Sequence, residues 1–417
     1  MAAIESLPSR LCELPPELFE LIAEEVDSED LFALRSTCRE IGHKVHRTFL
    51  NVHFSDRAFL LSSPESMQML VDLSKHEVFG SAIKRINLHV QMISAKEHYR
   101  TLRWDQRHDE VGLSRRQRLE LREGRRQYQQ MADAHRQFWT LKAWAAPLTE
   151  ALRNIKKGKG WSRGKVKLSL VYYQWSKNMG VLTPALCGRK SLERRLGHEF
   201  KTDWLEFAGE GQAMLMRAIG QGGCPVTELT LGKQHLTTFT KSELSNFYDF
   251  TAITSKKLFA GLRMLDVSLW VKHWRLHGEP EEMIRVQSWQ MRLLIKFLSG
   301  AKHLERLTLR CGYGKNFHCF QGFVEAAKVP LPKLKELTLI LLDPRPVDIF
   351  IFCIKHRATL KRVGVTPWPR RSPHKHEGWQ EYMNDWDPVE TMRKQMDRLC
   401  PDIAVVPYQI PPCEYSQ

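Results

Sequence analysis

The feature that most constrains this chain is a pair of amphipathic helix patterns within residues 14–49. Pro15 and Pro16 can open the first helix, because the first helical turn does not use the N–H groups that proline lacks. Apolar residues then recur at steps of three and four, which places them on one helix face. A polar break at residues 27–30 separates the two patterns. The apolar positions are Leu14, Leu18, Leu21, Ile22 and Val26 in the first helix, and Leu31, Leu34, Cys38, Ile41 and Val45 in the second.

Two helices of this length cannot bury both apolar faces against each other and still form a core. Either the rest of the chain or a partner protein must therefore cover them. In the first case residues 14–49 are an ordinary helical hairpin within a larger core. In the second case they are a docking module, and the motif spacing described next favours this interpretation.

The order of residues within this stretch resembles the F-box family. The shared pattern is Leu14-Pro15, then Ile22, a polar break, Asp30-Leu31 and Leu34-Arg-x-x-Cys38-Arg. F-boxes are three-helix units that bind a Skp-type adaptor and so join a cullin-RING ubiquitin ligase. Many carry a Trp near the end of the third helix, where this chain has Phe49. The resemblance covers residues 1–55 and implies an adaptor-facing set of Leu14, Pro15, Leu18, Ile22, Leu31, Leu34 and Cys38.

Length and composition predict a globular protein of more than one unit. The chain has 417 residues, of which 42% are hydrophobic and 26% charged. We expect an intracellular protein, cytoplasmic or nuclear, because the start of the chain lacks the basic and apolar regions of a secretory signal. Apolar runs such as residues 349–354 are too short to span a membrane. The nine cysteines include no C-x-x-C pair, so we expect free thiols.

Charge is distributed unevenly along the chain. Residues 1–40 hold ten acids and three bases, a net charge of −7, whereas residues 100–167 hold seven acids and eighteen bases, a net charge of +11. An acidic start and a basic middle indicate different partners for the two regions.

A recurring strand pattern organises the second half. Segments of the form apolar-x-x-apolar-x-apolar begin at Leu262, Leu304, Leu334 and Leu360 and are related to a predicted strand at residues 83–90. Residues 168–170 and 229–231 share the last half of this pattern. Helical patterns at residues 289–298 and 347–356 precede the copies at Leu304 and Leu360. Alternation of helix and strand is the unit of a leucine-rich-repeat solenoid. The spacing between copies is irregular, so an unrelated α/β domain remains the alternative. The predicted fold class is α/β, with a three-helix F-box followed by an irregular leucine-rich-repeat-like solenoid with a basic helical insertion.

The expected domains follow from these patterns. Residues 1–55 are the F-box, 56–90 a connector helix and first strand, and 91–165 the basic helical insertion. Residues 166–368 are the solenoid, and 369–417 a Pro- and Trp-rich cap and tail. Within the insertion we expect residues 114–128, which hold six arginines, to project into solvent, and residues 132–155 to pack on the solenoid.

No catalytic, cofactor or metal motif is present in the sequence. Nucleophile-elbow, zinc-protease and phosphate-loop patterns are absent, and the Gly-rich segment at residues 220–223 precedes a strand, so it predicts a turn. Cys311, His318 and Cys319 lack the second ligand pair of a zinc site, and His374 and His376 lie in a Pro-rich loop. We therefore expect no enzyme activity, no metal and no cofactor.

Two functions remain open from the sequence. The first is the substrate-recognition subunit of a Skp-adaptor/cullin/F-box ubiquitin ligase, with an unknown protein substrate; the chain resembles the divergent F-box proteins of filamentous fungi. The second is a non-catalytic binding module outside the ligase. In that case the basic segment, including residues 156–165 with Trp161, would bind an acidic protein or nucleic acid.

Overall fold

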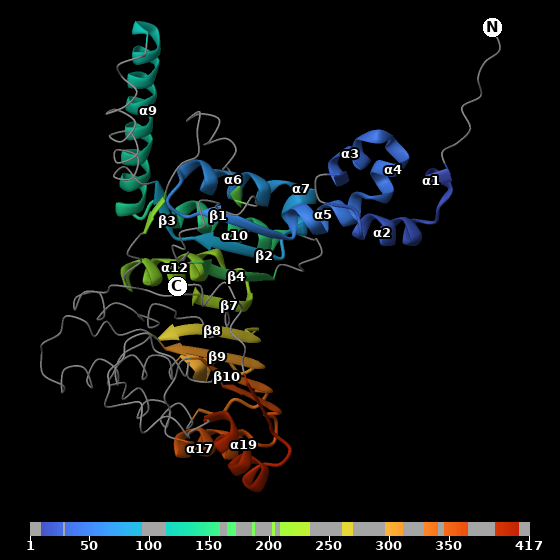
Figure 1. Ribbon diagram of the computed structural model, residues 1–417, viewed down its shortest axis with the longest axis vertical. Coiled ribbons are helices and arrows are strands. Elements are labelled where there is room, and N and C mark those ends of the chain that lie inside the picture. The colour runs from blue at the N-terminus through green and yellow to red at the C-terminus, as the bar shows by residue number, and fades with distance from the viewer. Residues whose placement is uncertain are drawn as a thin grey trace, which may run out of the picture.

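The computed structural model shows a mixed α/β protein organised around one large parallel sheet (Figure 1). It describes residues 10–27, 30–93, 114–158, 165–171, 186–187, 202–204, 209–233, 261–269, 297–311, 329–340, 346–365 and 388–407. Among these residues, no helix is long and apolar enough to cross a membrane.

Within the described residues the sheet contains ten strands, and each neighbouring pair is parallel. From β2 onward the strands lie in chain order, while β1 and then β5 continue the sheet beyond β2. In chain order these strands are β1 (Asp56–Leu60), β2 (Arg85–His89), β4 (Val166–Val171), β5 (Leu186–Cys187), β7 (Val226–Lys233), β8 (Met264–Leu269), β9 (Arg306–Cys311), β10 (Glu336–Ile340), β11 (Arg362–Val365) and β12 (Ala404–Pro407). A separate antiparallel pair joins β3 (Gln91–Ile93) to β6 (Thr202–Trp204).

The predicted apolar pattern forms a continuous ladder across the sheet. Equivalent apolar residues pair in register from strand to strand, so each buried side chain stacks on the next. The side chains between them point to the other face, because direction alternates along a strand. The ladder runs through Ile86, Leu168, Leu229, Leu265, Leu307, Leu337, Val363 and Val405, all at most 9% exposed.

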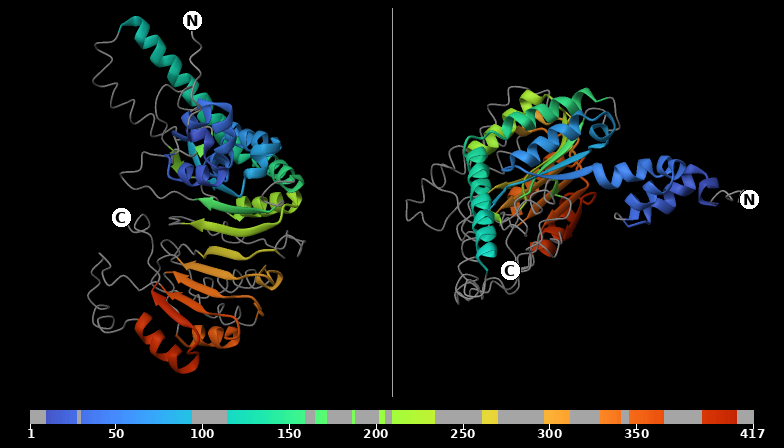
Figure 2. Two further views of the ribbon diagram at one scale, coloured as in Figure 1. Left: turned by 90° about the vertical axis from the view of Figure 1, so that its right-hand side faces the viewer. Right: turned by 90° about the horizontal axis from the view of Figure 1, so that it is seen from above.

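Helices cover one face of the sheet and complete its core (Figure 2). α6 (Pro64–Lys75), α10 (Ala145–Lys157) and α12 (Gly209–Gly222) lie side by side, with the short α7 (Glu77–Ala82) beside α6. At the other end α17 (Pro346–His356) contacts α19 (Pro388–Leu399). The close contact of α10 and α12 depends on Gly222, since a Cβ there would lie 2.6 Å from Leu152 Cβ. Gly223, with φ of 65°, then ends α12 and turns the chain towards β7. The turn predicted at residues 220–223 is therefore present only at its last residue, because residues 220–222 belong to α12.

The sheet extends further in both directions than the sequence predicted. The expected connector at residues 56–90 contributes β1 and β2 to the sheet, rather than a single first strand. The expected cap contributes α19 and β12, which pairs with β11 as a further strand. α10 packs within the layer of helices, as expected for part of residues 132–155. The parallel sheet and its helices therefore include regions that the sequence assigned to other domains.

The helical pattern at residues 132–155 is divided into two helices. α9 (Arg115–Thr140) ends in a motif in which the Lys142 N–H bonds to the Trp139 carbonyl and the Ala143 N–H bonds to the Phe138 carbonyl. This is the Schellman arrangement, and its left-handed position is occupied by Lys142 with φ of 54° rather than by glycine. The chain then turns, and α10 begins at Ala145.

The first half of α9 stands away from the sheet (Figure 1), as predicted. Its described arginines at 115, 116, 122 and 126 are exposed, and Tyr128, only 1% exposed, marks where burial begins. Further along, His135 is fully buried, and its Nε2 lies 3.3 Å from Glu65 Oε2 of α6. Only the second half of α9 is therefore anchored to the body.

Removing residues 114–127 should lower the melting temperature by no more than about 2 °C, because the segment contributes little buried apolar area. A matched deletion of residues 114–135 also removes the buried Tyr128, Met131 and His135, and should destabilise the chain strongly. Thermal unfolding of both variants checks this expectation. Equal losses in the two deletions would show that the arginines support the fold.

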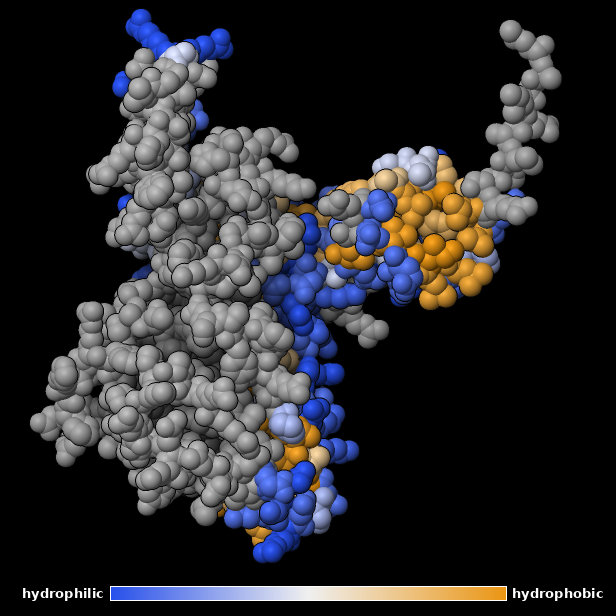
Figure 3. Space-filling view, in the orientation of Figure 1, coloured by the Kyte–Doolittle hydropathy of each residue, from blue (hydrophilic) through white to orange (hydrophobic). Residues whose placement is uncertain are grey.

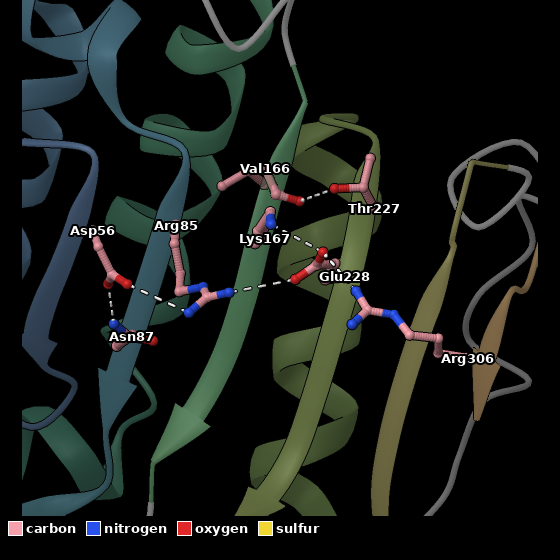
Figure 4. A network of polar contacts seen from close by, with 8 residues as sticks. All are labelled: Asp56, Arg85, Asn87, Val166, Lys167, Thr227, Glu228 and Arg306. Atoms are coloured by element: carbon pink, nitrogen blue, oxygen red, sulfur yellow. Dashed lines mark hydrogen bonds and ion pairs between the residues drawn. The ribbon is translucent and has the colours of Figure 1, made fainter. Parts of the chain in front are cut away.

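A charge network joins the strands where they begin (Figure 4). The side chain of Glu228 in β7 is 16% exposed, and its carboxylate forms salt bridges with three cationic side chains. Its distances are 2.9 Å to Lys167 Nζ, 3.3 Å to Arg306 Nη2 and 3.4 Å to Arg85 Nη2. Arg85 also lies 3.4 Å from Asp56, which accepts a hydrogen bond from Asn87. One carboxylate therefore links β2, β4 and β9, and reaches β1 through Arg85.

Replacing Glu228 with glutamine should lower the free energy of unfolding by about 1–2 kcal/mol, because three neighbouring cations lose their shared counter-charge. Glu305→Gln provides the matched control. Its side chain is 30% exposed, with Lys335 at 3.0 Å and Arg263 at 4.0 Å, so its loss should cost less than about 0.5 kcal/mol. Chemical denaturation of the two variants would contradict the expectation if Glu305→Gln were the more harmful.

Candidate docking surface on the N-terminal helices

Five helices at the start of the chain form a small unit with its own core. They are α1 (Arg10–Glu13), α2 (Pro16–Glu24), α3 (Asp30–Thr37), α4 (Arg39–Lys44) and α5 (His46–Phe54). At the centre of the unit, Phe49 contacts Phe32 edge-on at 5.0 Å between ring centroids, and the Arg35 guanidinium lies 4.3 Å from the same ring. The buried cluster comprises Phe19, Ala23, Leu31, Ile41, Val45 and Phe49.

The first helix begins as the prolines predict. Pro16 occupies the first turn of α2, and Pro15 precedes it in an extended conformation, with φ of −53° and ψ of 144°. Glu17 lies in the same turn, where the positive end of the helix favours a carboxylate. The polar break at residues 27–30 is also present, since α2 ends at Glu24 and α3 begins at Asp30.

The second predicted helix is divided into three. Cys38 adopts an extended conformation, with φ of −155°, and its sulfur accepts a hydrogen bond from the Ile41 N–H at 3.5 Å. It therefore caps α4 instead of continuing α3. Val45 then separates α4 from α5, although its side chain stays in the core as the apolar spacing predicts.

α2 has two apolar sides, and only one faces the core. Phe19 and Ala23 point inward and are at most 1% exposed. Leu18, Leu21 and Ile22 lie on the opposite side and are 50%, 61% and 45% exposed; we call them the α2 apolar face. Figure 3 shows apolar atoms gathered over this end of the molecule. A stripe of large apolar side chains that the chain leaves exposed is typical of a protein-binding surface.

The seven residues predicted to face an adaptor divide into three groups. Leu18, Ile22, Pro15 and Cys38 are exposed. Leu14 and Leu34 are half-buried at the edge of the core cluster. The third group is Leu31 alone, which is buried.

Lys44 brings the start of α2 close to α4, because its ammonium donates hydrogen bonds to the carbonyl oxygens of Cys12 and of Leu14, the second at 2.9 Å.

Leu31 is the exception, and its assignment to the adaptor-facing set is corrected. Its side chain is fully buried in the cluster with Phe49, so it stabilises the helical unit itself. Its neighbour Phe32 is 53% exposed instead. Successive residues on a helix point about 100° apart, so a small rotation of α3 decides which of the two is buried.

Among the described residues of the helical unit, four exposed apolar residues were missing from the predicted set: Leu11, Leu21, Phe32 and Val52, which are 42%, 61%, 53% and 46% exposed. Leu21 belonged to the apolar stripe recognised in the sequence, and its spacing from Leu18 could have included it. The other three have no such signal. Leu11 lies in a helix of only four residues, Phe32 lies beside the stripe that begins at Leu31, and Val52 lies beyond the last residue of that stripe, Val45.

The helical unit is joined closely to the sheet. Only Ser55 separates α5 from β1, and its carbonyl accepts the N–H groups of both Lys84 and Arg85 at 2.8 Å. Phe54 stacks on Phe79 of α7, with 4.3 Å between ring centroids and an 8° angle between ring planes. Lys84 Nζ also donates to Asn51 Oδ1 at 3.0 Å. These contacts fix the position of the α2 apolar face relative to the sheet.

Within the part of the chain that the structure describes, no group of three His, Cys, Asp or Glu side chains is placed to hold a metal ion. Of the residues considered in the sequence, Cys311 belongs to β9, while His318, Cys319, His374 and His376 lie outside the described residues, as does Trp161.

No protein-family model matches the chain, and comparison with curated proteins finds no match either.

Proposed function

We propose that the chain is the substrate-recognition subunit of a Skp-adaptor/cullin/F-box ubiquitin ligase. The observation that supports this most is the α2 apolar face. Its residues Leu18 and Ile22 are exposed and belong to the motif that resembles an F-box. A face of this kind fits a helical adaptor that buries it on binding.

In this proposal the remaining strands and helices form an irregular leucine-rich-repeat-like solenoid that binds the substrate. Two observations support it: within the large sheet β2, β4 and β7 to β12 follow chain order, and their apolar residues stack in register. A sheet of this kind offers a long surface for a protein partner. The close junction through Phe54 and Phe79 would hold a captured substrate at a set distance from the ligase.

In this function the chain contributes proximity rather than catalysis. Binding adaptor and substrate at once raises the effective concentration of a substrate lysine near the conjugating enzyme. Catalytic groups would then belong to other subunits. We place the complex in the cytoplasm or the nucleus.

The test is co-purification of the full chain with a Skp-type adaptor and a cullin, followed by a ubiquitin-transfer assay with the captured proteins. We expect both subunits to be recovered, and to be lost when Leu18 and Ile22 are replaced with alanine. If wild type and variant recover the adaptor equally, the proposed interface is wrong.

A second candidate function is a binding module outside the ligase. The exposed arginines of α9 favour it, because a projecting basic helix fits an acidic protein or a nucleic acid. The same co-purification distinguishes the two. A chain that retains the adaptor but never a cullin, and loses its other partner when residues 114–127 are deleted, belongs to this second class.

A further inference from the structure

Two thiols meet beside the proposed docking surface. Cys12 lies in α1, and Cys38 lies at the start of α4; their Sγ atoms are 3.9 Å apart. The S–S bond of a disulfide is about 2.0 Å long, so a movement of about 2 Å would bring the two sulfurs into bonding distance. α1 contains only four residues, and a helix this short has little intrinsic stability to resist such a movement.

The two thiols differ in a way that assigns each a role. Cys38 is exposed, and the hydrogen bond from the Ile41 N–H to its sulfur lowers the pKa of its thiol. Cys12 is half-buried, and burial raises the pKa of its thiol. Because the thiolate is the nucleophile, Cys38 is the residue that an oxidant reaches and converts first.

Three other cysteines whose side-chain burial the structure describes lack these properties. Cys224, Cys353 and Cys400 are buried in the core of the sheet and its helices. Burial raises the pKa of the Cys224 and Cys353 thiols to about 12. Thiols of this kind are inert towards oxidants, which makes the Cys12 and Cys38 pair selective among them.

We propose that Cys12 and Cys38 are a peroxide-sensitive pair whose disulfide weakens docking at the α2 apolar face. The Cys38 thiolate attacks one oxygen of hydrogen peroxide, the O–O bond breaks, and the departing hydroxide takes up a proton as water. Cys38 is then a sulfenic acid. The Cys12 thiol attacks its sulfur, the S–O bond breaks, and a second water leaves. Two thiols are thus oxidised by two electrons to one disulfide, and one peroxide is reduced to two waters.

The effect on docking rests on the proposed function. Cys38 belongs to the adaptor-facing set, and a disulfide would draw its sulfur away from the surface towards α1. The same bond would displace the segment that leads into Leu14, which Lys44 now holds through the carbonyls of Cys12 and Leu14. We expect the oxidised chain to bind a Skp-type adaptor about tenfold more weakly than the reduced chain.

The chemical part is tested on the purified full chain. The reduced protein is treated with hydrogen peroxide, remaining thiols are blocked with N-ethylmaleimide, and the chain is digested without reductant for mass spectrometry. We expect a linked peptide pair containing Cys12 and Cys38. In Cys12→Ser no link should form, and Cys38 should proceed to sulfinic acid. An unlinked wild type, with Cys38 either unmodified or carrying sulfinic acid, would overturn the proposal.

The regulatory part is tested by the affinity of the oxidised and reduced chains for the adaptor. Dithiothreitol should restore full affinity, and peroxide should leave the affinity of the double variant Cys12→Ser with Cys38→Ser unchanged, because neither a disulfide nor a sulfinic acid can form at these positions. Circular dichroism checks that this double variant folds, with the double alanine variant as the second choice. Equal affinity of the linked and reduced chains overturns the regulation. If neither form binds the adaptor, the proposed function fails and the regulation with it, whereas the disulfide itself is judged by the mass spectrum alone.

Discussion

Replacing Leu18 and Ile22 with alanine should raise the Kd for a Skp-type adaptor about 100-fold. Burying a Leu or Ile side chain contributes about 1.5–3 kcal/mol, and both residues are about half exposed in the free chain. Their truncation should therefore cost binding energy without disturbing the core formed by Phe19 and Ala23 on the other side of α2. Titration calorimetry with the purified adaptor measures the change.

The matched control for this variant is Ile351→Ala with Ile354→Ala on α17. These side chains are 43% and 44% exposed, close to the values for Leu18 and Ile22, but they lie at the opposite end of the sheet from the N-terminal helices. The control should leave the Kd within about twofold. A folded Leu18 and Ile22 variant that binds as tightly as the wild type would remove the basis for an adaptor surface on α2.

Adaptor binding measured together with folding also distinguishes surface residues from core residues in α3. Because Leu31 is fully buried, Leu31→Ala should weaken adaptor binding only by destabilising the helical unit, which circular dichroism would detect. The sequence could not distinguish these roles. Leu31 and Phe32 are adjacent and both apolar, and the direction in which α3 faces is set by its contacts with Phe49 and His53.

The strand pattern was far more informative than the helix pattern. Apolar-x-x-apolar-x-apolar segments predicted the buried residues of β8, β9, β10 and β11, because strand side chains alternate and a slip by one residue would expose all of them. The same apolar pattern, or its last half, predicted parts of β2, β4 and β7. A single buried face was enough to determine the register of these strands.

Other elements left no such signal. β1 begins with Asp56 and Arg57, and β12 ends in Pro407, so neither sequence has the apolar pattern of a core strand. Both segments form strands because they pair with β2 and with β11, respectively. The end of α9 was equally hidden, because Lys142 occupies the left-handed position where sequence rules expect glycine. For the two strands, pairing with residues distant in sequence overrides the local preference.

The ladder of stacked residues leads to the second large effect. Leu337 is fully buried between Leu307 and Val363, its partners in the two neighbouring strands. Leu337→Ala should destabilise this part of the sheet by about 2–5 kcal/mol, since truncation removes buried area and leaves a cavity. Hydrogen exchange of the amides in β9, β10 and β11 should accelerate at least about 30-fold, which corresponds to the lower limit of that range. Adaptor affinity should stay unchanged, because the N-terminal helices have a separate core.

Thr338→Ala is the control, because it changes the next residue of the same strand. Its side chain is half-buried on the opposite face, in register with Thr308, so truncation should cost less than about 1 kcal/mol and leave exchange nearly unaffected. The contrast between adjacent positions tests the alternation that defines the sheet. If Thr338→Ala accelerated exchange as much as Leu337→Ala, the two faces would be equally important for stability. The proposal that one face of the sheet is free to bind a protein partner would then lose its support.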